Sequence, residues 1–136
     1  MNDFPEFEIF QDYSGADIKF QYVFFDVGRC YSVKAHEVKV KEPGRVFSAY
    51  DNNDPVNVLL KIRKIIKEEL NTRYFTESAE DKFDSMNFDY FQGNIADGTN
   101  SEICMVVDGK EMTIKDFQHF LEPYNGYRIE IKITEE

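Results

Sequence analysis

Strict alternation of apolar and polar residues dominates the first 50 residues. Every second residue from Ala16 to Phe24 is apolar or aromatic, and the intervening Asp17, Lys19 and Gln21 are polar, which is the period of a half-buried strand; Val23 and Phe25 make its far end apolar on both faces. Similar patterns predict strands at 7–9, 31–35 and 46–50, with turns at Ser14-Gly15, Gly28-Arg29 and Pro43-Gly44. Four consecutive strands with short connections predict an antiparallel meander.

The meander pattern contains one irregularity. Val38 and Val40 have the opposite parity to Tyr31 and Val33, so we expect a bulge or kink near His36-Glu37. A bulge often changes the direction in which the neighbouring side chains point. His36 and Glu37 are therefore the pair that we consider for acid–base chemistry, although no catalytic motif surrounds them.

A helix follows from Asp54 to about Arg73. Asp54 is a suitable N-cap, Pro55 suits the first helical position, and one face is apolar at helical spacing: Leu59, Ile62, Ile66 and Leu70, flanked by Val58 and Ile65. The opposite face carries a concentrated group of basic residues that includes Lys61, Lys64 and Lys67. These lysines are the candidate binding residues for an anion or an acidic partner; a solvated helix face is the alternative interpretation.

The C-terminal half alternates between strand and helix signals. We expect a mobile acidic loop at 76–82, a strand at 86–90, a central strand at 103–107 and a final strand at 127–133, where isoleucines alternate with polar residues. Thr113 and Asp116 form a variant of the capping box and open a short helix. The whole pattern predicts one α+β domain over residues 1–136: an antiparallel sheet, made of the N-terminal meander and C-terminal strands, packed on one side by two helices in the order ββββ-α-ββ-α-β.

Composition agrees with one folded core. The 136 residues are 42% hydrophobic and include 13 Phe and 8 Tyr, which excludes a disordered chain. No apolar run approaches the roughly 20 residues of a membrane span and no signal peptide is evident, so we expect a cytoplasmic protein without a membrane partner. Cys30 and Cys104 lie within or beside apolar segments, and we expect both to be reduced, buried thiols.

The net charge of −10 is concentrated at the C-terminal end, since residues 76–136 carry 14 acidic and 5 basic side chains. This charge argues against direct nucleic-acid binding and favours a protein partner, especially a basic one. Solubility alone is the competing explanation. The nine aromatic residues between Phe4 and Tyr31 are too many for one face of a small meander, so some should reach the surface, where a partner or a homodimer would use them.

The C-terminal motif Val107-Asp108-Gly109-Lys110-Glu111-Met112-Thr113, followed by Phe117, Leu121 and Tyr124-Asn125-Gly126-Tyr127, resembles a bacterial family of small domains of unknown function. Members of that family read roughly IDGKEhTWEEFGRMLxxxEGWxhxhxI, where h is apolar. The chain departs from the family at Ile114-Lys115-Asp116-Phe117-Gln118 and at Asn125-Gly126. The resemblance covers 105–133 best and extends loosely to about residue 44, through Asn53-Asp54-Pro55. It implies a structural motif of turn, cap and core positions and a bacterial or phage origin, without an activity.

Other candidate chemistry is weak. The two histidines, His36 and His119, lack metal-ligand spacing, and we expect His119 to be partly buried. Asp51-Asn52-Asn53-Asp54 resembles the start of a calcium loop but lacks its glycine and its final glutamate. The sequence therefore indicates no metal and no cofactor. It favours a non-enzymatic protein-binding module of the immunity or inhibitor kind; the alternative is a small-molecule-binding or hydrolytic domain with a site near His36 and Glu37.

Overall fold

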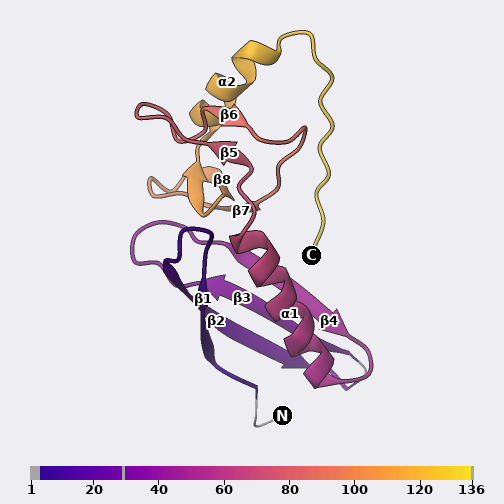
Figure 1. The fold of residues 1–136 in the computed structure, drawn as a ribbon. Helices are drawn as coiled ribbons and strands as arrows, with labels where there is room; N and C mark the ends of the chain where they lie inside the picture. The colour runs from indigo at the N-terminus through magenta and orange to yellow at the C-terminus, as the bar shows by residue number, and fades with distance from the viewer. Residues whose placement is uncertain (1–3, 29, 136) are drawn as a thin grey trace.

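The computed structural model describes residues 4–28 and 30–135 and has the predicted α+β class. Its sheets are antiparallel, and two α-helices accompany them. Figure 1 shows two parts stacked end to end: a four-stranded sheet with the longer helix, and a second part that contains the shorter strands and the shorter helix.

The N-terminal part is the predicted meander. Strands β1 (Phe7–Gln11), β2 (Asp17–Asp26), β3 (Tyr31–Glu37) and β4 (Val46–Asp51) are hydrogen-bonded in the order β1-β2-β3-β4. Because β1 and β4 each have one neighbour, they are the two edges of this sheet. The aromatic residues divide as expected: Phe10, Phe20 and Tyr22 are buried, whereas Phe7, Tyr13 and Phe25 are exposed.

The bulge expected near His36-Glu37 is absent. The register between β2 and β3 is unbroken from Asp26↔Tyr31 to Phe20↔Glu37, and His36 pairs with Val46 on the other side. The change of parity at Val38 arises because β3 ends at Glu37 and the chain enters the loop 38–45, where Val40 is almost fully exposed.

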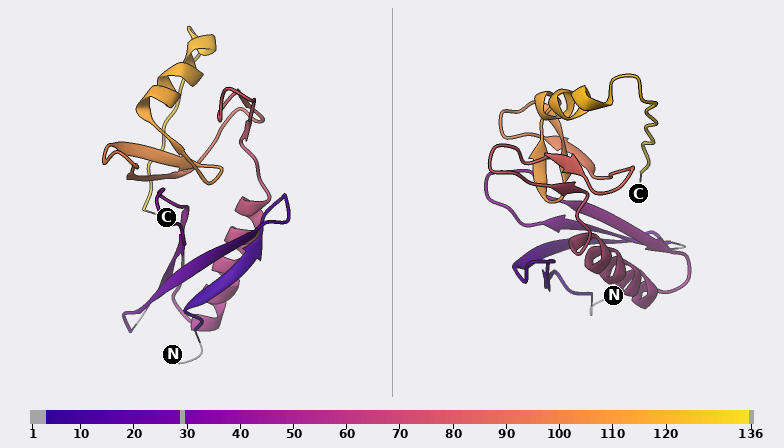
Figure 2. Two further views of the ribbon diagram at one scale, coloured as in Figure 1. Left: turned by 90° about the vertical axis from the view of Figure 1, so that its left-hand side faces the viewer. Right: turned by 45° about the horizontal axis from the view of Figure 1, so that its top comes forward.

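Helix α1 spans Pro55–Leu70 and lies against one face of this sheet (Figure 2). The side chain of Asp54 accepts a hydrogen bond from the amide of Val56, as its predicted role as N-cap requires. The helix ends three residues earlier than expected. Its buried face packs with the sheet into the first hydrophobic cluster: Phe10, Phe20, Tyr22, Val33, Ala35, Ala49, Val58, Ile62, Ile66 and Leu70.

The C-terminal part has more strands between the two helices than the sequence indicated. They are β5 (Phe75–Thr76), β6 (Ser85–Met86), β7 (Asn94–Asp97), β8 (Ile103–Val107) and β9 (Lys110–Met112). β5 pairs with β6, and β8 lies between β7 and β9, which agrees with the predicted central position of 103–107. The strand predicted at 86–90 is reduced to β6, because Phe88 and Tyr90 leave the sheet to pack edge-on against Tyr74.

Helix α2 spans Ile114–Leu121 and is followed by a short 3₁₀ helix, Glu122–Tyr124. Thr113 and Asp116 form both hydrogen bonds of the predicted capping box. The C-terminal part has its own hydrophobic cluster: Tyr74, Phe75, Phe83, Val107, Met112 and Phe120. The expected arrangement of one sheet covered by both helices is therefore wrong, because each helix belongs to a separate cluster. A single domain over 1–136 stays a prediction.

The final segment differs most from expectation. Residues 127–135 are extended but form no β-ladder with any described strand, and all of them are exposed. The alternation that predicted a strand is present in the sequence, but residues 4–28 and 30–135 do not supply a neighbouring strand.

Candidate functional site

The two candidate acid–base residues do not act on each other. His36 and Glu37 are successive residues of β3, so their side chains point to opposite faces of the sheet. Glu37 accepts a hydrogen bond of 3.0 Å from the amide of Arg45, and its other oxygen lies 3.4 Å from Arg45 Nη1. Its side chain is only 5% exposed. This geometry gives Glu37 a structural role and leaves a hydrolytic site here a prediction without a geometric basis.

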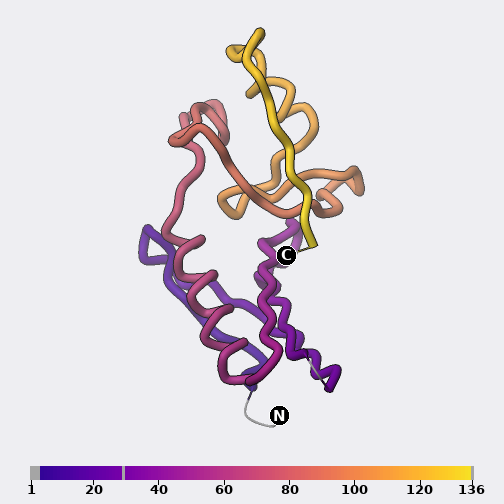
Figure 3. Tube along the Cα trace, turned by 90° about the vertical axis from the view of Figure 1, so that its right-hand side faces the viewer, coloured from indigo at the N-terminus to yellow at the C-terminus, as the bar shows by residue number. Residues whose placement is uncertain are grey.

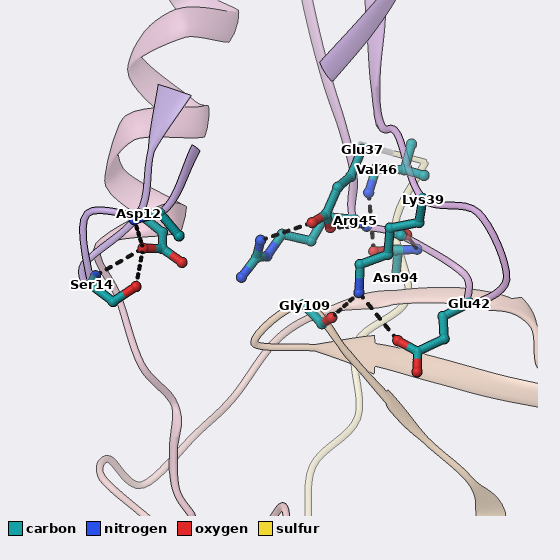
Figure 4. A network of polar contacts seen from close by, with 11 residues as sticks. Asp12, Ser14, Glu37, Lys39, Glu42, Arg45, Val46, Asn94 and Gly109 are labelled. Atoms are coloured by element: carbon teal, nitrogen blue, oxygen red, sulfur yellow. Dashed lines mark hydrogen bonds and ion pairs between the residues drawn. The ribbon is translucent and has the colours of Figure 1, made fainter. Parts of the chain in front are cut away.

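Glu37 belongs to a polar seam that joins the two parts of the molecule, shown in Figure 4. Lys39 Nζ donates to the carbonyl of Gly109 at 2.6 Å and lies 3.5 Å from Glu42. The Asn94 side chain bridges the loop and β4: its oxygen accepts from the Val46 amide and its nitrogen donates to the Gly44 carbonyl, each at 3.2 Å.

Arg45 also contacts the β8–β9 turn. A Cβ built on Gly109 would lie 2.6 Å from the guanidinium carbon of Arg45, so the arginine packs directly on this glycine. Gly109 is buried and has a φ of +74°, and the preceding Asp108 has a φ of +54°. Both residues adopt the left-handed conformation that a tight two-residue hairpin turn requires.

The residues of the motif around this turn have structural roles. Asp108 accepts hydrogen bonds from two backbone amides at the start of the C-terminal part, and Glu111 accepts from the amide and hydroxyl of Thr99. The hydroxyl of Thr99 lowers the pKa of Glu111, and its amide adds to this effect. Lys110 forms an ion pair with Glu77. Burial lowers the pKa of Lys110, with the nearby charges of Arg73 and Arg45 as additional causes.

The predicted basic face of α1 divides into two sides. Lys61 faces β4, where Nζ donates to the Tyr50 carbonyl at 3.0 Å and to Asp51 at 2.9 Å. The hydrogen bond from Lys61, followed by the backbone amides of Asn53 and Asp54, lowers the pKa of Asp51 to about 2. On the opposite side, Lys67 lies near Glu8 of β1, and its charge is one cause that lowers the pKa of Glu8.

A groove of about 480 Å³ lies between α1 and β4. Its lining consists of small and aromatic residues of β4 and basic, apolar and acidic residues of α1: Ser48, Ala49, Tyr50, Lys61, Lys64, Ile65 and Glu68. Two of the three candidate lysines, Lys61 and Lys64, therefore line it, whereas Lys67 does not. Lys64 extends to solvent, with a side chain 77% exposed and 4.0 Å from Glu68.

The strand that borders the groove has an open hydrogen-bonding edge. The Arg45 carbonyl accepts from the Glu37 amide, so the odd-numbered residues of this stretch direct their main-chain groups towards β3. The even-numbered residues direct theirs away from β3, which agrees with the bonds of the Val46 amide to Asn94 and of the Tyr50 carbonyl to Lys61. Between them, the amide and carbonyl of Ser48 face the free edge of the sheet.

The remaining candidates for chemistry are metal-ligating clusters, the loop before α1, His119 and the two cysteines. In the described ranges 4–28 and 30–135, no group of three or more His, Cys, Asp or Glu side chains is arranged to hold a metal ion. Asp51 and Asp54 instead stabilise the turn and cap α1. His119 is exposed rather than partly buried and lies 3.3 Å from Asp81. Cys30 and Cys104 are free thiols. Cys104 is buried as expected, which raises its pKa, whereas Cys30 is only partly buried.

The comparison with known families gives one match. Residues 74–136 match the model of a domain of unknown function, DUF7713. The match begins at the first residue of the second hydrophobic cluster and includes the motif segment 105–133. It does not include Asn53-Asp54-Pro55, so the upstream extension of the family resemblance stays a prediction. No curated protein and no solved structure matches the chain.

The helices in the described part of the chain include none that is long and apolar enough to cross a membrane. The sequence pointed to the lysines of the groove but not to the groove itself. Only the strand order shows that β4 is an edge, and only the packing of α1 shows which lysines lie beside it.

Proposed function

We propose that this chain is a non-enzymatic protein-binding module whose groove between β4 and α1 receives an extended segment of a partner protein. One observation carries the proposal. The main-chain groups of Ser48 face an open sheet edge beside a groove that residues of β4 and α1 line. Addition of a strand to such an edge is a recurrent mode of peptide recognition, in which main-chain hydrogen bonds supply affinity and side chains supply specificity.

The groove also offers the side-chain chemistry that such recognition needs. Ile65 of α1 supplies apolar contact area to the lining, and Tyr50 of β4 is another lining residue. Lys64 projects into solvent beside them, and Lys61 is held in place by Asp51. The exposed ammonium of Lys64 favours a segment that carries a carboxylate, in contrast to the basic partner that the acidity of residues 76–136 favours.

The role that fits these features is that of a small protein that recognises another protein, as immunity and inhibitor proteins do. The family resemblance of the C-terminal motif supports a bacterial or phage source. The groove that carries the proposal lies in the N-terminal part, outside the residues matched by the family model. Partner recognition is therefore a property that the N-terminal part adds to the matched domain.

The test is an affinity capture from lysate of the source organism with the wild-type protein and the variant Ser48→Pro. Proline removes the outward-facing amide and adds a ring at the free edge, but leaves the hydrogen bonds to β3 in place because Ser48 does not make them. We expect a specific protein to be retained by the wild type and its recovery to fall about tenfold with Ser48→Pro. Circular dichroism and a thermal melt establish that the variant is folded.

Two charge-reversal variants of lysines on α1 provide a matched control. Lys64→Glu reverses a charge in the groove, whereas Lys67→Glu reverses a charge of the same helix that does not line the groove and lies towards Glu8 of β1, with the same change in net charge. The proposal expects reduced capture with Lys64→Glu and unchanged capture with Lys67→Glu. Equal recovery with Ser48→Pro and wild type, or the absence of any specific protein, would refute binding at this groove.

A further inference from the structure

The C-terminal segment 127–133 is an extended strand with one apolar face. Figures 1 and 3 show the chain leaving α2 and running back towards the N-terminal part along one side of the molecule. Arg128 Nη2 lies 2.8 Å from Glu130 Oε1, and such contact between residues two apart occurs when both side chains are on one face of an extended chain. The opposite face consists of residues that are 57% to 75% exposed: Tyr127, Ile129, Ile131 and Ile133.

This arrangement leaves a strand-forming sequence without a sheet. Isoleucine and tyrosine are among the residues most enriched in strands, and strict alternation is the pattern of a strand buried on one face. An exposed extended segment with these properties readily pairs with another chain. No described strand of the same molecule pairs with it.

We propose that segment 127–133 pairs antiparallel with the same segment of a second copy of this chain, with the two-fold axis at Ile131. The proposal does not depend on the groove between β4 and α1. It concerns a different element, in the part of the chain that matches the family of unknown function.

Charge complementarity selects this partner and this register. With Ile131 opposite Ile131, Glu130 of each chain lies opposite Lys132 of the other, so the symmetry produces two opposite-charge pairs. In the same register Ile129 lies opposite Ile133, and the apolar side chains of both strands share one face. A segment that binds its own copy in this way is self-complementary, as a two-fold interface requires.

Neighbouring registers are unfavourable. A shift that places Glu130 opposite its own copy also places Arg128 opposite Lys132, so like charges face each other at every polar pair. The opposite shift places Lys132 opposite its own copy. A shift of one residue mixes apolar with polar side chains on both faces.

The two paired segments form a two-stranded ribbon. This ribbon also needs an apolar surface to pack on, because two strands alone are marginally stable in water. The same part of the molecule offers apolar residues for this purpose. Ile95 pairs across the sheet with Met105, two residues beyond Ile103, so Ile95 and Ile103 lie on one face of β7 and β8. Both are 58% exposed, and they provide the surface on which the isoleucine face of the ribbon can pack.

The test begins with the mass of the wild-type protein in solution, measured by size-exclusion chromatography with light scattering at about 100 μM, a concentration at which a micromolar dimer is populated. We expect twice the 16.0 kDa of the chain. Ile131→Asp places two aspartates face to face at the two-fold axis and should yield a monomer, while its exposure predicts an intact fold. Val40→Asp is the matched control, because Val40 is also aliphatic, more exposed and distant in sequence, and it should leave the dimer unchanged.

Charge reversal tests the register itself. Glu130→Lys and Lys132→Glu each create two like-charge pairs and should weaken the dimer at least about tenfold, whereas the double variant Glu130→Lys with Lys132→Glu should restore it. A monomeric wild type, a dimer that tolerates Ile131→Asp, or a double variant as weak as the single ones would each overturn the proposal. A dimer that survives Ile131→Asp but dissociates with Ser48→Pro would assign the contact to the groove beside β4 instead.

Discussion

The carboxylate of Asp108 accepts a hydrogen bond of 2.9 Å from the backbone amide of Tyr74, across 34 residues of sequence. Its second oxygen accepts from the amide of Phe75 at the same distance. The β8–β9 turn is thereby tied to the point at which the chain enters the second hydrophobic cluster and at which the family match begins. The aspartate of the motif therefore organises the C-terminal part from its first residue.

Replacement of Asp108 by Ala should destabilise the protein by about 2–4 kcal/mol, because two buried residues lose the acceptor for their amides and alanine tolerates the positive φ poorly. Asp108→Asn should cost less, since asparagine keeps one acceptor oxygen and adopts this conformation more readily. Equilibrium unfolding in urea measures both. A change below about 0.5 kcal/mol for Asp108→Ala would show that these hydrogen bonds do not stabilise the fold.

Substitutions of Gly109, which lies in the polar seam, and of Gly126, which lies outside it, test the packing of the seam. Both have a positive φ, but a Cβ at Gly109 would meet the guanidinium of Arg45, whereas a Cβ at Gly126 would meet nothing within 4 Å. Gly126→Ala should cost about 1–2 kcal/mol from backbone strain alone. Gly109→Ala should cost more, because Arg45 must also move away from Glu37. Equal losses in urea unfolding would contradict the close packing of Arg45 on this turn.

Stability should fall in acid through two carboxylates of the N-terminal part. The pKa of Asp51 is lowered from 3.8 to about 2, with the hydrogen bond from Lys61 as the largest cause. Burial raises the pKa of Glu8, but hydrogen bonds from Arg63 and Tyr22 outweigh it and lower the pKa below 4.5. Because both values are lower in the folded state, the unfolded chain binds more protons, and the stabilisation present above about pH 5 is lost towards pH 2.

The variant Glu8→Gln should reduce this pH dependence. The glutamine amide does not titrate and places no negative charge beside Arg63 and Tyr22. The free energy of unfolding, measured by urea titration at several pH values, checks the slope. Glu80→Gln changes an exposed carboxyl in the loop after β5 and should keep the wild-type slope. An unchanged slope with Glu8→Gln would contradict the assigned role of the ion pair.

Local signals predicted most of the elements. The alternation of β2, the N-cap Asp54 with Pro55, and the capping box of Thr113 depend on neighbours in sequence, and each appears in the structure as expected. The hydrophobic positions of α1 were equally informative, because a helix of 16 residues displays its buried face several times.

Features that depend on distant residues were not predictable from the pattern. The split into two clusters arises because α2 packs on Phe75 and Met112 rather than on the first sheet. The alternation at 127–133 identifies strand-forming residues but not the strand beside them, and the parity change at Val38 marks the end of β3 as well as it would mark a bulge. The lysines were visible in the sequence, whereas the groove depends on which strand is the edge.

The central claim, that a partner segment adds to the free edge of β4, is tested most directly by amide hydrogen exchange in the complex with the captured partner. The amides of Ser48 and Tyr50 face the edge, whereas the amide of Ala49 faces β3. The account predicts at least about tenfold slower exchange at Ser48 and Tyr50 in the complex, with Ala49 little changed. A complex in which Ser48 and Tyr50 exchange as fast as in the free protein would contradict it.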